Sequence, residues 1–410
     1  MNAKLILIPI FLIGSCVAQL DPDLLDDIFS NTKYPIEIID QVFRKSNFET
    51  TDHPVTTVGQ KNLPRERTVS SYQLCGPNKV CVRQYLCNNG KFNNHGGFII
   101  QPHLGSECNI GLETCCDISE TSDEPILNPL PSTVGCGYRN KNGLGIKIKE
   151  PTDDEAEFGE FPWMVLISEK IITNGKVKSS FKCGGSLIAP TVVLTGAHCV
   201  KSTQARNIQV RAGEWQSNSD VEPFPHQDRQ VVEKIMHENF DDVRLENNIA
   251  LLFLETPFDK DPHINTVCLP PVNTNFDMSR CIASGWGRKR FRSKKYPKIM
   301  KKIELPVVPN AKCQNDLRQT RLGPSFELHS SFMCAGGEHN KDTCKGDGGG
   351  PLVCPMANNP NRYYQVGIVS WGIGCFDENV PGVYASIPHL RSWIDEQLAY
   401  KDIHVNSFTP

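Results

Sequence analysis

The residues with the most evident chemistry are cysteines, of which the 410-residue chain has 17. Thiols in an oxidising compartment pair as disulfides, whereas zinc-binding thiols usually occur as C-x-x-C pairs, which this chain lacks. Cys16 lies within the N-terminal residues 1–18, which are expected to be removed as a leader, and 16 cysteines then remain. This even number predicts eight disulfides and no obligatory free thiol.

Two groups of charged side chains could bind ligands. The segment Arg288–Lys298 has seven basic residues in eleven, which suits polyanion binding, contact with an acidic partner, proteolysis, or simply a solvated loop. Glu214, Asp220 and Glu222 offer the oxygen ligands that Ca²⁺ prefers, but their loose spacing is equally typical of exposed acids. We expect no other metal or cofactor.

Charge and hydropathy exclude two broad classes of protein. The formal net charge of −3 argues against a strongly basic nucleic-acid-binding protein. The longest apolar run follows Lys4 over residues 5–13 and leads to small residues that end at Ala18. This pattern is typical of a secretory signal peptide over residues 1–18, and it is too short to span a membrane. We therefore expect a secreted, extracellular protein that binds neither nucleic acids nor membranes.

Changes in composition divide the rest of the chain into four segments. Residues 19–74 form an acidic extension without cysteine, and residues 75–116 contain six cysteines. Residues 117–135, rich in Ser, Thr, Pro and acids, are a linker. Residues 136–410 form one large domain, with its core at about 158–399.

The six-cysteine segment is too short to bury much apolar core, so disulfides must stabilise its fold. Its cysteines are Cys75, Cys81, Cys87, Cys108, Cys115 and Cys116. Sequence alone allows fifteen pairings. The adjacent pair at 115 and 116 must point its side chains in opposite directions, as neighbours on a strand do.

Short apolar runs recur between turn residues throughout the large domain, for example Trp163–Ile167 and Ile249–Leu254. Many short strands without interleaved helices predict a mainly β fold, either a barrel or a sandwich. Only Ile387–Leu398 has the apolar spacing of a helix.

Eight segments of this domain resemble the trypsin/chymotrypsin family of serine proteases, in that family's order. They are Phe161-Pro162-Trp163, Cys183–Ile188, Leu194–Cys199, Ile249–Leu252, Cys281–Gly287, Gly346–Val353, Val369–Gly372 and Pro381–Tyr384. The resemblance covers nearly the whole domain and implies a two-barrel β fold. A fold does not by itself supply an activity.

The resemblance places the family's catalytic triad on His198, Asn248 and Gly348. His198 matches the general base, but Gly348 has no hydroxyl, and the amide of Asn248 replaces the carboxylate that holds the base in its productive tautomer. In related proteases the amide costs about 10⁴ in turnover and loss of the nucleophile about 10⁶. We therefore expect no enzyme, and a protease using Thr343 or Ser370 instead is the less favoured alternative.

The chain lacks the family's activation sequence but retains the residues of its specificity pocket. Asp347 matches the residue that pairs with the new N-terminus of an activated protease. The chain has no Ile/Val-Val-Gly-Gly start, so this carboxylate has no evident partner by the family's usual route. Asp342, Gly372 and Gly382 match the charged floor and small walls of a pocket for Arg or Lys. That pocket could receive a partner's cation or be an inherited, blocked feature.

The resemblance also implies five disulfides in the large domain. They are Cys136–Cys268, Cys183–Cys199, Cys281–Cys354, Cys313–Cys334 and Cys344–Cys375.

The six-cysteine segment resembles the clip domain found in arthropod haemolymph proteases and their inactive homologues. With the linker and the altered triad, residues 75–399 resemble the clip-domain serine protease homologues, and among them the prophenoloxidase-activating cofactors. This resemblance implies a secreted haemolymph protein that binds prophenoloxidase or its activating clip-domain protease, and so assists melanisation in innate immunity.

The sequence is also compatible with other functions that depend on binding alone. A negative regulator, a decoy or a protein that recognises microbial surfaces would need no catalysis either. If a trypsin-like enzyme processes the chain, Arg65, Arg67 and Arg83 are the candidate cleavage sites.

Overall fold

A computed structural model describes residues 73–83, 86–88, 98–100, 108, 113–122, 135–144, 146–148, 154–173, 176–217, 222, 224–287, 299–339, 347–373 and 378–403. Several sequence predictions fall outside these ranges. They concern the leader, the acidic extension up to residue 72, Arg65, Arg67, Asp220, Arg288–Lys298, Asp342, Thr343 and the pair Cys344–Cys375. No helix among the described residues is long and apolar enough to cross a membrane.

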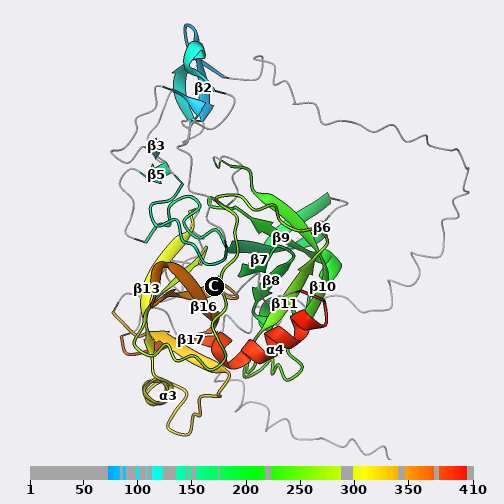
Figure 1. Cartoon of the computed structure of the whole chain (residues 1–410), viewed down its shortest axis with the longest axis vertical. Coiled ribbons are helices and arrows are strands. Elements are labelled where there is room, and N and C mark those ends of the chain that lie inside the picture. The colour runs from blue at the N-terminus through cyan, green and yellow to red at the C-terminus, as the bar shows by residue number, and fades with distance from the viewer. Residues whose placement is uncertain are drawn as a thin grey trace, which may run out of the picture. The chain divides into compact units, whose positions relative to one another are not determined.

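Six antiparallel strands close into the first barrel, in the order β10-β11-β8-β7-β6-β9 (Figure 1). They are β6 (Met164–Thr173), β7 (Lys176–Ala189), β8 (Val192–Thr195), β9 (Ile208–Ala212), β10 (Gln227–Met236) and β11 (Ala250–Leu254). Strand β9 buries alternate residues, as expected when one face lines a barrel interior. Strand β11 is buried on both faces, and this explains why its sequence is an unbroken apolar run.

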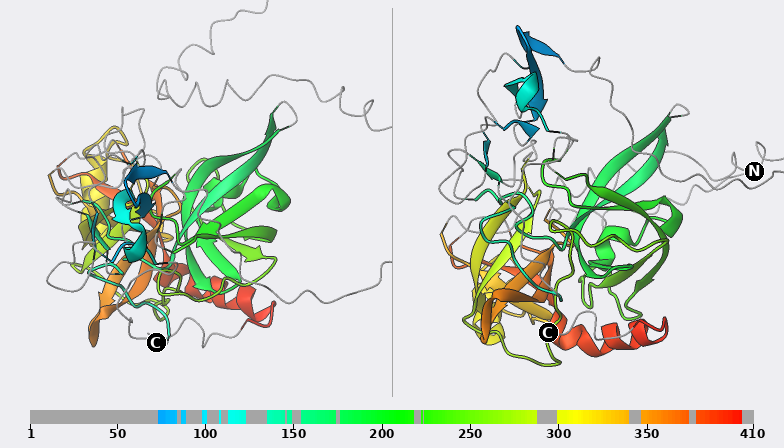
Figure 2. Two further views of the ribbon diagram at one scale, coloured as in Figure 1. Left: turned by 90° about the horizontal axis from the view of Figure 1, so that it is seen from above. Right: turned by 45° about the horizontal axis from the view of Figure 1, so that its top comes forward.

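Six further strands close into the second barrel, in the order β12-β13-β14-β17-β16-β15. They are β12 (Arg280–Gly285), β13 (Lys301–Val308), β14 (Phe332–Gly336), β15 (Pro351–Met356), β16 (Asn359–Trp371) and β17 (Pro381–Ser386). Figure 2 shows the two barrels next to each other, the first in green and the second in yellow to orange. The two-barrel, mainly β prediction is therefore confirmed.

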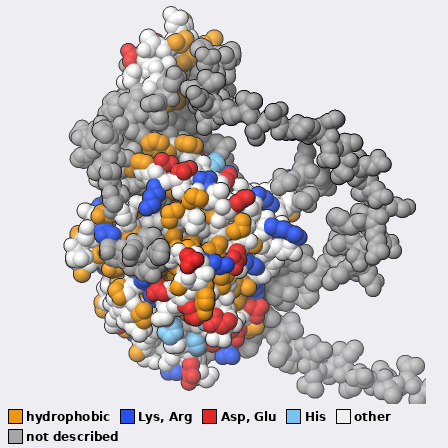
Figure 3. Space-filling model, turned by 45° about the vertical axis from the view of Figure 1, so that its right-hand side comes forward, with side chains coloured by type: hydrophobic (Ala, Val, Ile, Leu, Met, Phe, Trp, Pro, Cys, Tyr) orange, Lys and Arg blue, Asp and Glu red, His pale blue; other side chains and the backbone are white. Residues whose placement is uncertain are grey.

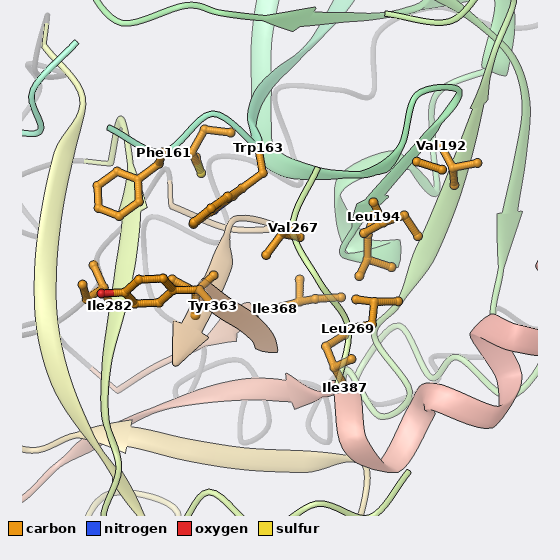
Figure 4. Packing of buried hydrophobic residues seen from close by; sticks show 14 of the residues in the cluster. Phe161, Trp163, Val192, Leu194, Val267, Leu269, Ile282, Tyr363, Ile368 and Ile387 are labelled. Carbon is orange, nitrogen blue, oxygen red and sulfur yellow. The ribbon is translucent and has the colours of Figure 1, made fainter. Parts of the chain in front are cut away.

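The core between the barrels is a continuous apolar cluster. Leu194 and Leu251 of the first barrel, Ile368 of the second, and Trp163 all belong to it and are fully buried. Figure 4 shows Trp163, Leu194 and Ile368 converging on the same core as Ile387, the first residue of the C-terminal helix. Each barrel also has its own interior cluster. The junction that carries the candidate site is therefore a rigid, dry interface.

Two α-helices of eight residues or more are described. Helix α4 (Ile387–Ala399) starts directly after β17 and ends one residue beyond the predicted range Ile387–Leu398. Helix α3 (Asn310–Arg318) was not predicted, so the expectation of a single helix was wrong. Its only buried side chains are Cys313 and Leu317, one turn apart, and two positions are too few to give a periodic apolar pattern.

The cysteine-rich segment forms a small antiparallel sheet, β1-β2-β4. Its strands are β1 (Leu74–Gly76), β2 (Lys79–Arg83) and β4 (Glu113–Asp117), followed by the 3-10 turn η5 (Ile118–Glu120). Three disulfides crosslink it, Cys75–Cys115, Cys81–Cys108 and Cys87–Cys116. The adjacent cysteines of β4 thus bind different partners, as their opposite directions require. Strand β3 (Phe98–Ile100) pairs in parallel with β5 (Ile146–Ile148).

A segment preceding the first barrel is fastened to the second. The disulfide Cys136–Cys268 and the hydrogen bond from Gly137 N to Thr266 O (2.7 Å) hold its beginning. Glu160, whose side chain is fully buried, accepts hydrogen bonds from Arg139 and from Lys302 of β13. We call residues 136–160 the strap.

Candidate functional site: a triad position without a nucleophile

Four segments from both barrels meet at the candidate site. His198 lies on the short helix α2 (Ala197–Val200), directly after β8, and Asn248 lies just before β11. Gly348 lies in the turn before β15, and Ser370 is near the end of β16. The structure thus brings together the three residues that the sequence assigns to a triad.

The backbone around this junction is tightly fixed. Gly184 N donates to Gly348 O at 3.0 Å, and Thr195 Oγ1 donates to Gly184 O at 2.9 Å. The disulfide Cys183–Cys199 connects β7 to α2 beside His198. His198 and Gly348 are therefore held in place by the fold and need no ligand to bring them together.

Asn248 fixes the tautomer of His198. Asn248 Oδ1 accepts the His198 backbone N–H at 3.0 Å, and Asn248 Nδ2 donates to Ser370 Oγ at 2.7 Å. Nδ2 also lies 2.8 Å from His198 Nδ1, nearer than Oδ1 at 3.1 Å. Two N–H donors do not face each other at this distance, so we assign Nδ1 as an acceptor and place the imidazole proton on Nε2.

The opposite side of the His198 ring agrees with this assignment. His198 Nε2 lies 3.4 Å from Cys199 Sγ, which is a weak acceptor for an N–H. Burial lowers the pKa of His198 below its ordinary value of 6.5. A neutral ring with its proton on Nε2 cannot accept a proton at the nitrogen that faces Gly348.

Gly348 leaves the nucleophile position without a functional group. A Cβ built on this residue would lie 3.0 Å from His198 Nε2 and 3.8 Å from Cys183 Sγ. The contact with Nε2 is tight, so a side chain here would require the imidazole to move by a few tenths of an ångström. Ser370, the alternative hydroxyl, is engaged as an acceptor for Asn248, and Thr343 lies outside the described residues.

Asp347 has a partner that the sequence did not reveal. Its Oδ1 accepts the backbone N–H of Gly287 at 2.8 Å, a partner other than the new N-terminus that the family uses. A Cβ on Gly285 or Gly287 would lie 2.5 or 2.2 Å from this carboxylate. The motif Gly285-Trp286-Gly287 therefore has a steric reason, and its two glycines were the signal that could have suggested a close neighbour.

The predicted cation pocket is described only in part. Gly382 lies in β17 opposite Ala335 of β14, and Gly372 directly follows β16. Trp371, beside Gly372, packs edge-on against Phe332 at 5.9 Å between ring centroids. Asp342 lies outside the described residues, so an open or a blocked pocket both stay predictions.

The two described members of the predicted calcium site have protein partners. Glu214 Oε2 accepts a hydrogen bond from Arg211 Nη1 at 3.1 Å, and Glu222 Oε1 accepts one from Gln216 N at 3.0 Å. Among the described residues, the groups close enough to share a metal consist of cysteines, with or without His198. Those cysteines are oxidised, and a disulfide offers no thiolate ligand. Calcium binding stays a prediction.

Four of the five disulfides implied for the large domain are present. They are Cys136–Cys268, Cys183–Cys199, Cys281–Cys354 and Cys313–Cys334. The fifth, Cys344–Cys375, lies outside the described residues. Of the candidate cleavage sites only Arg83 is described, in β2 opposite Glu113 of β4. Its backbone is part of a sheet, so a protease would have to open this pair first.

Comparison with known proteins agrees with this arrangement. A family model described as trypsin matches residues 152–394, and one described as serine protease clip domain PPAF-2 matches residues 68–117. Phenoloxidase-activating factor 2 of Galleria mellonella is 48% identical over 298 residues, covering 70% of this chain and 98% of that protein. Two relatives from Anopheles gambiae, named inactive CLIP domain-containing serine proteases A8 and A28, are 37% and 36% identical. They cover 78% and 80% of this chain, and 88% and 90% of their own lengths.

These matches extend beyond the two barrels to the cysteine-rich segment. The trypsin model alone spans more than half of the chain, and the relatives match over most of their own lengths. Two of them carry the word inactive in their names. The chain therefore belongs to the trypsin family, and within it to the clip-domain serine protease homologues.

Proposed function

We propose that this chain is a secreted, non-catalytic protein that assists the proteolytic activation of prophenoloxidase by binding. Its partner is prophenoloxidase, its activating clip-domain protease, or both. The observation that carries the proposal is Gly348, which leaves a well-ordered triad position with no atom able to attack a peptide bond.

The absence of catalysis rests on two independent changes. Gly348 removes the nucleophile, and Asn248 supports the tautomer in which His198 cannot act as a base toward that position. Replacing only the carboxylate by an amide costs related proteases about 10⁴ in turnover. An error or a single inactivating change at Gly348 would not account for Asn248 as well.

The link to prophenoloxidase comes from the relatives. The protein that matches over 98% of its length is named phenoloxidase-activating factor 2, and the clip-domain model that matches residues 68–117 carries a corresponding name. The disulfides described above fit an oxidising, extracellular compartment such as haemolymph. Two barrels and a crosslinked clip module offer surface for binding without requiring catalysis.

A reconstituted reaction tests this proposal. Prophenoloxidase and its activating protease are mixed with and without the protein, and phenoloxidase activity is followed. A parallel assay measures cleavage of an arginine-amide substrate by the protein alone. We expect phenoloxidase activity to rise and the amide to remain uncleaved. A fall in phenoloxidase activity would indicate a negative regulator instead, and amide cleavage by the protein alone would overturn the non-catalytic assignment.

A further inference from the structure

A pocket on the first barrel lies apart from the triad position. It has a volume of about 390 Å³, near the lower end of the range for ligand pockets. Strands β6, β7, β9 and β10 and the segment after β9 contribute its walls. The lining residues are Leu166, Ser168, Ser179, Ser180, Phe181, Gln209, Arg211, Glu214, Ser217, Asp228 and Trp286. We call this the β9–β10 pocket.

The charges that line this pocket do not cancel. Arg211 donates from Nε and Nη2 to the two carboxylate oxygens of Asp228 at 2.8 and 2.9 Å, and from Nη1 to Glu214 at 3.1 Å. All three of these donor atoms therefore point at carboxylates. One cation faces two anions, so the lining has a net charge of about −1 when Glu214 and Asp228 are ionised.

The geometry of the two carboxylates suits an added cation. Asp228 lines the pocket and keeps 32% of its side chain exposed. Glu214 has only 1% of its side chain exposed, which means that its charge acts in a region poorly screened by water. Each carboxylate oxygen of Asp228 accepts one hydrogen bond from Arg211, and a carboxylate oxygen can accept a second.

The remaining walls suit a flat cation with several N–H donors. Ser168, Ser179 and Ser180 contribute hydroxyls from the base of the β6–β7 hairpin, and Phe181 and Trp286 contribute aromatic rings. A guanidinium both stacks on aromatic rings and donates to oxygens in its plane, which an ammonium does less well. On the face drawn in Figure 3, acidic and basic side chains are interspersed, so a local pocket is a better candidate than a broad charged surface.

We propose that the β9–β10 pocket receives an arginine side chain of a protein partner. The proposal goes beyond the non-catalytic role, because it assigns a binding position and a ligand chemistry to a surface remote from His198. It also stands without that role, since direct binding of a peptide tests it.

The test uses a fluorescein-labelled pentapeptide, Gly-Ser-Arg-Ser-Gly, and a matched peptide with citrulline, the neutral isostere of arginine. Fluorescence anisotropy is measured on the full chain at physiological salt, with EDTA to remove metal ions. We expect the arginine peptide to bind at least about tenfold more tightly than the citrulline peptide, the equivalent of one favourable charge contact. Equal affinities, or no binding of either peptide up to about 1 mM, would overturn the proposal.

Variants locate the binding. Asp228→Asn preserves shape but cancels the net charge, and Ser180→Trp fills the pocket. Both should lose most of the preference for arginine while keeping the native circular dichroism spectrum. Glu233→Gln is the matched control, because Glu233 lies on the same strand, forms an exposed ion pair with Lys401, and does not line the pocket.

The variant Asp342→Asn distinguishes the β9–β10 pocket from a second possible arginine site. It removes the carboxylate of the cation pocket that is expected from the sequence. We expect this variant to bind the arginine peptide as the parent does. Loss of binding in Asp342→Asn but not in Asp228→Asn would assign the arginine to that other pocket and contradict the proposal. If Asp228→Asn and Glu233→Gln weaken binding of the arginine peptide equally, the effect comes from the overall charge of the protein. That result would also contradict the proposal.

Discussion

At the scale of single residues, one amide has a large chemical effect. A carboxylate at position 248 would accept a hydrogen bond from Nδ1–H of His198 and leave Nε2 free to act as a base. The amide of Asn248 instead places Nδ2 at 2.8 Å from Nδ1, and it is anchored by its second hydrogen bond to Ser370. His198 therefore carries its proton on Nε2, the nitrogen that faces Gly348, where a catalytic base would need a free lone pair.

The tautomer of His198 can be observed directly. We expect the ring to be neutral near pH 7, with its proton on Nε2, because burial lowers its pKa and Asn248 donates to Nδ1. Nitrogen-15 chemical shifts of the labelled imidazole distinguish the two tautomers. A proton on Nδ1 would contradict the assignment, and Asn248→Asp should move the proton to Nδ1.

Restoring the nucleophile alone should not restore a protease. Gly348→Ser supplies a hydroxyl, but Asn248 still holds His198 in the unproductive tautomer, so we expect no more than trace cleavage of an arginine-amide substrate. The double variant Gly348→Ser with Asn248→Asp should exceed the single variant, by up to about 10⁴ in turnover. The matched control is Gly348→Ala with Asn248→Asp, which should be inactive.

At the scale of elements, the strap connects regions far apart in sequence through a buried ionic cluster. Glu160 Oε2 accepts from Lys302 Nζ at 2.7 Å and from Glu157 N at 2.8 Å, while Arg139 donates to Oε1. Arg139 also lies over the ring of Phe161 at 5.0 Å. A carboxylate with no exposed side-chain surface is stable here only because two cations and a backbone amide neutralise and solvate it.

Removing that charge should be costly. We expect Glu160→Gln to lower the free energy of unfolding by about 3–5 kcal/mol, because Arg139 and Lys302 would then lose their shared anion. Chemical denaturation measures the change. Glu169→Gln serves as the control, since the ion pair of Glu169 with Lys182 is partly exposed and should contribute less than about 1 kcal/mol. Similar losses in both variants would contradict the role assigned to the cluster.

The burial of individual strands and helices explains which of them could be predicted from the sequence. The apolar runs of β8 and β11 predicted strands correctly because both faces of each are buried. Helix α3 was not predicted because its only buried side chains are Cys313 and Leu317, and two positions give no periodic apolar pattern.

For the site, motif order located His198, Asn248 and Gly348, since these positions are fixed by strand ends. The Gly287–Asp347 hydrogen bond and the Arg139–Glu160–Lys302 cluster could not be predicted, because each joins residues with no local sequence relation. The β9–β10 pocket is likewise a property of four strands together.

At the scale of the whole molecule, burial lowers the pKa of several histidines. Desolvation is the largest cause of the lowered pKa values of His198, His237, His263 and His389. His263 packs against both Phe158 and Phe224, which also contact each other, and its Nδ1 is buried without a hydrogen-bond partner among the described residues. A proton on this ring would therefore be poorly solvated.

Stability should decline in mild acid as a consequence. The unfolded histidines take up protons near pH 6.5, whereas the folded ones do so only at lower pH, so the unfolded state binds more protons in this window. The free energy of unfolding should thus fall as pH drops below about 6.5. Denaturation at several pH values measures it, and His263→Phe, which keeps the ring stack but cannot titrate, should flatten the decline. An unchanged slope in that variant would contradict the assignment.

The most direct test of the account is whether the effect on prophenoloxidase needs His198. Wild-type protein and the His198→Ala variant, both checked for native circular dichroism, are added to prophenoloxidase and its activating protease. If the protein acts only by binding, we expect the wild type and the variant to increase phenoloxidase activity equally. An increase with the wild type that disappears in His198→Ala would show that the site still performs chemistry and would contradict the non-catalytic account.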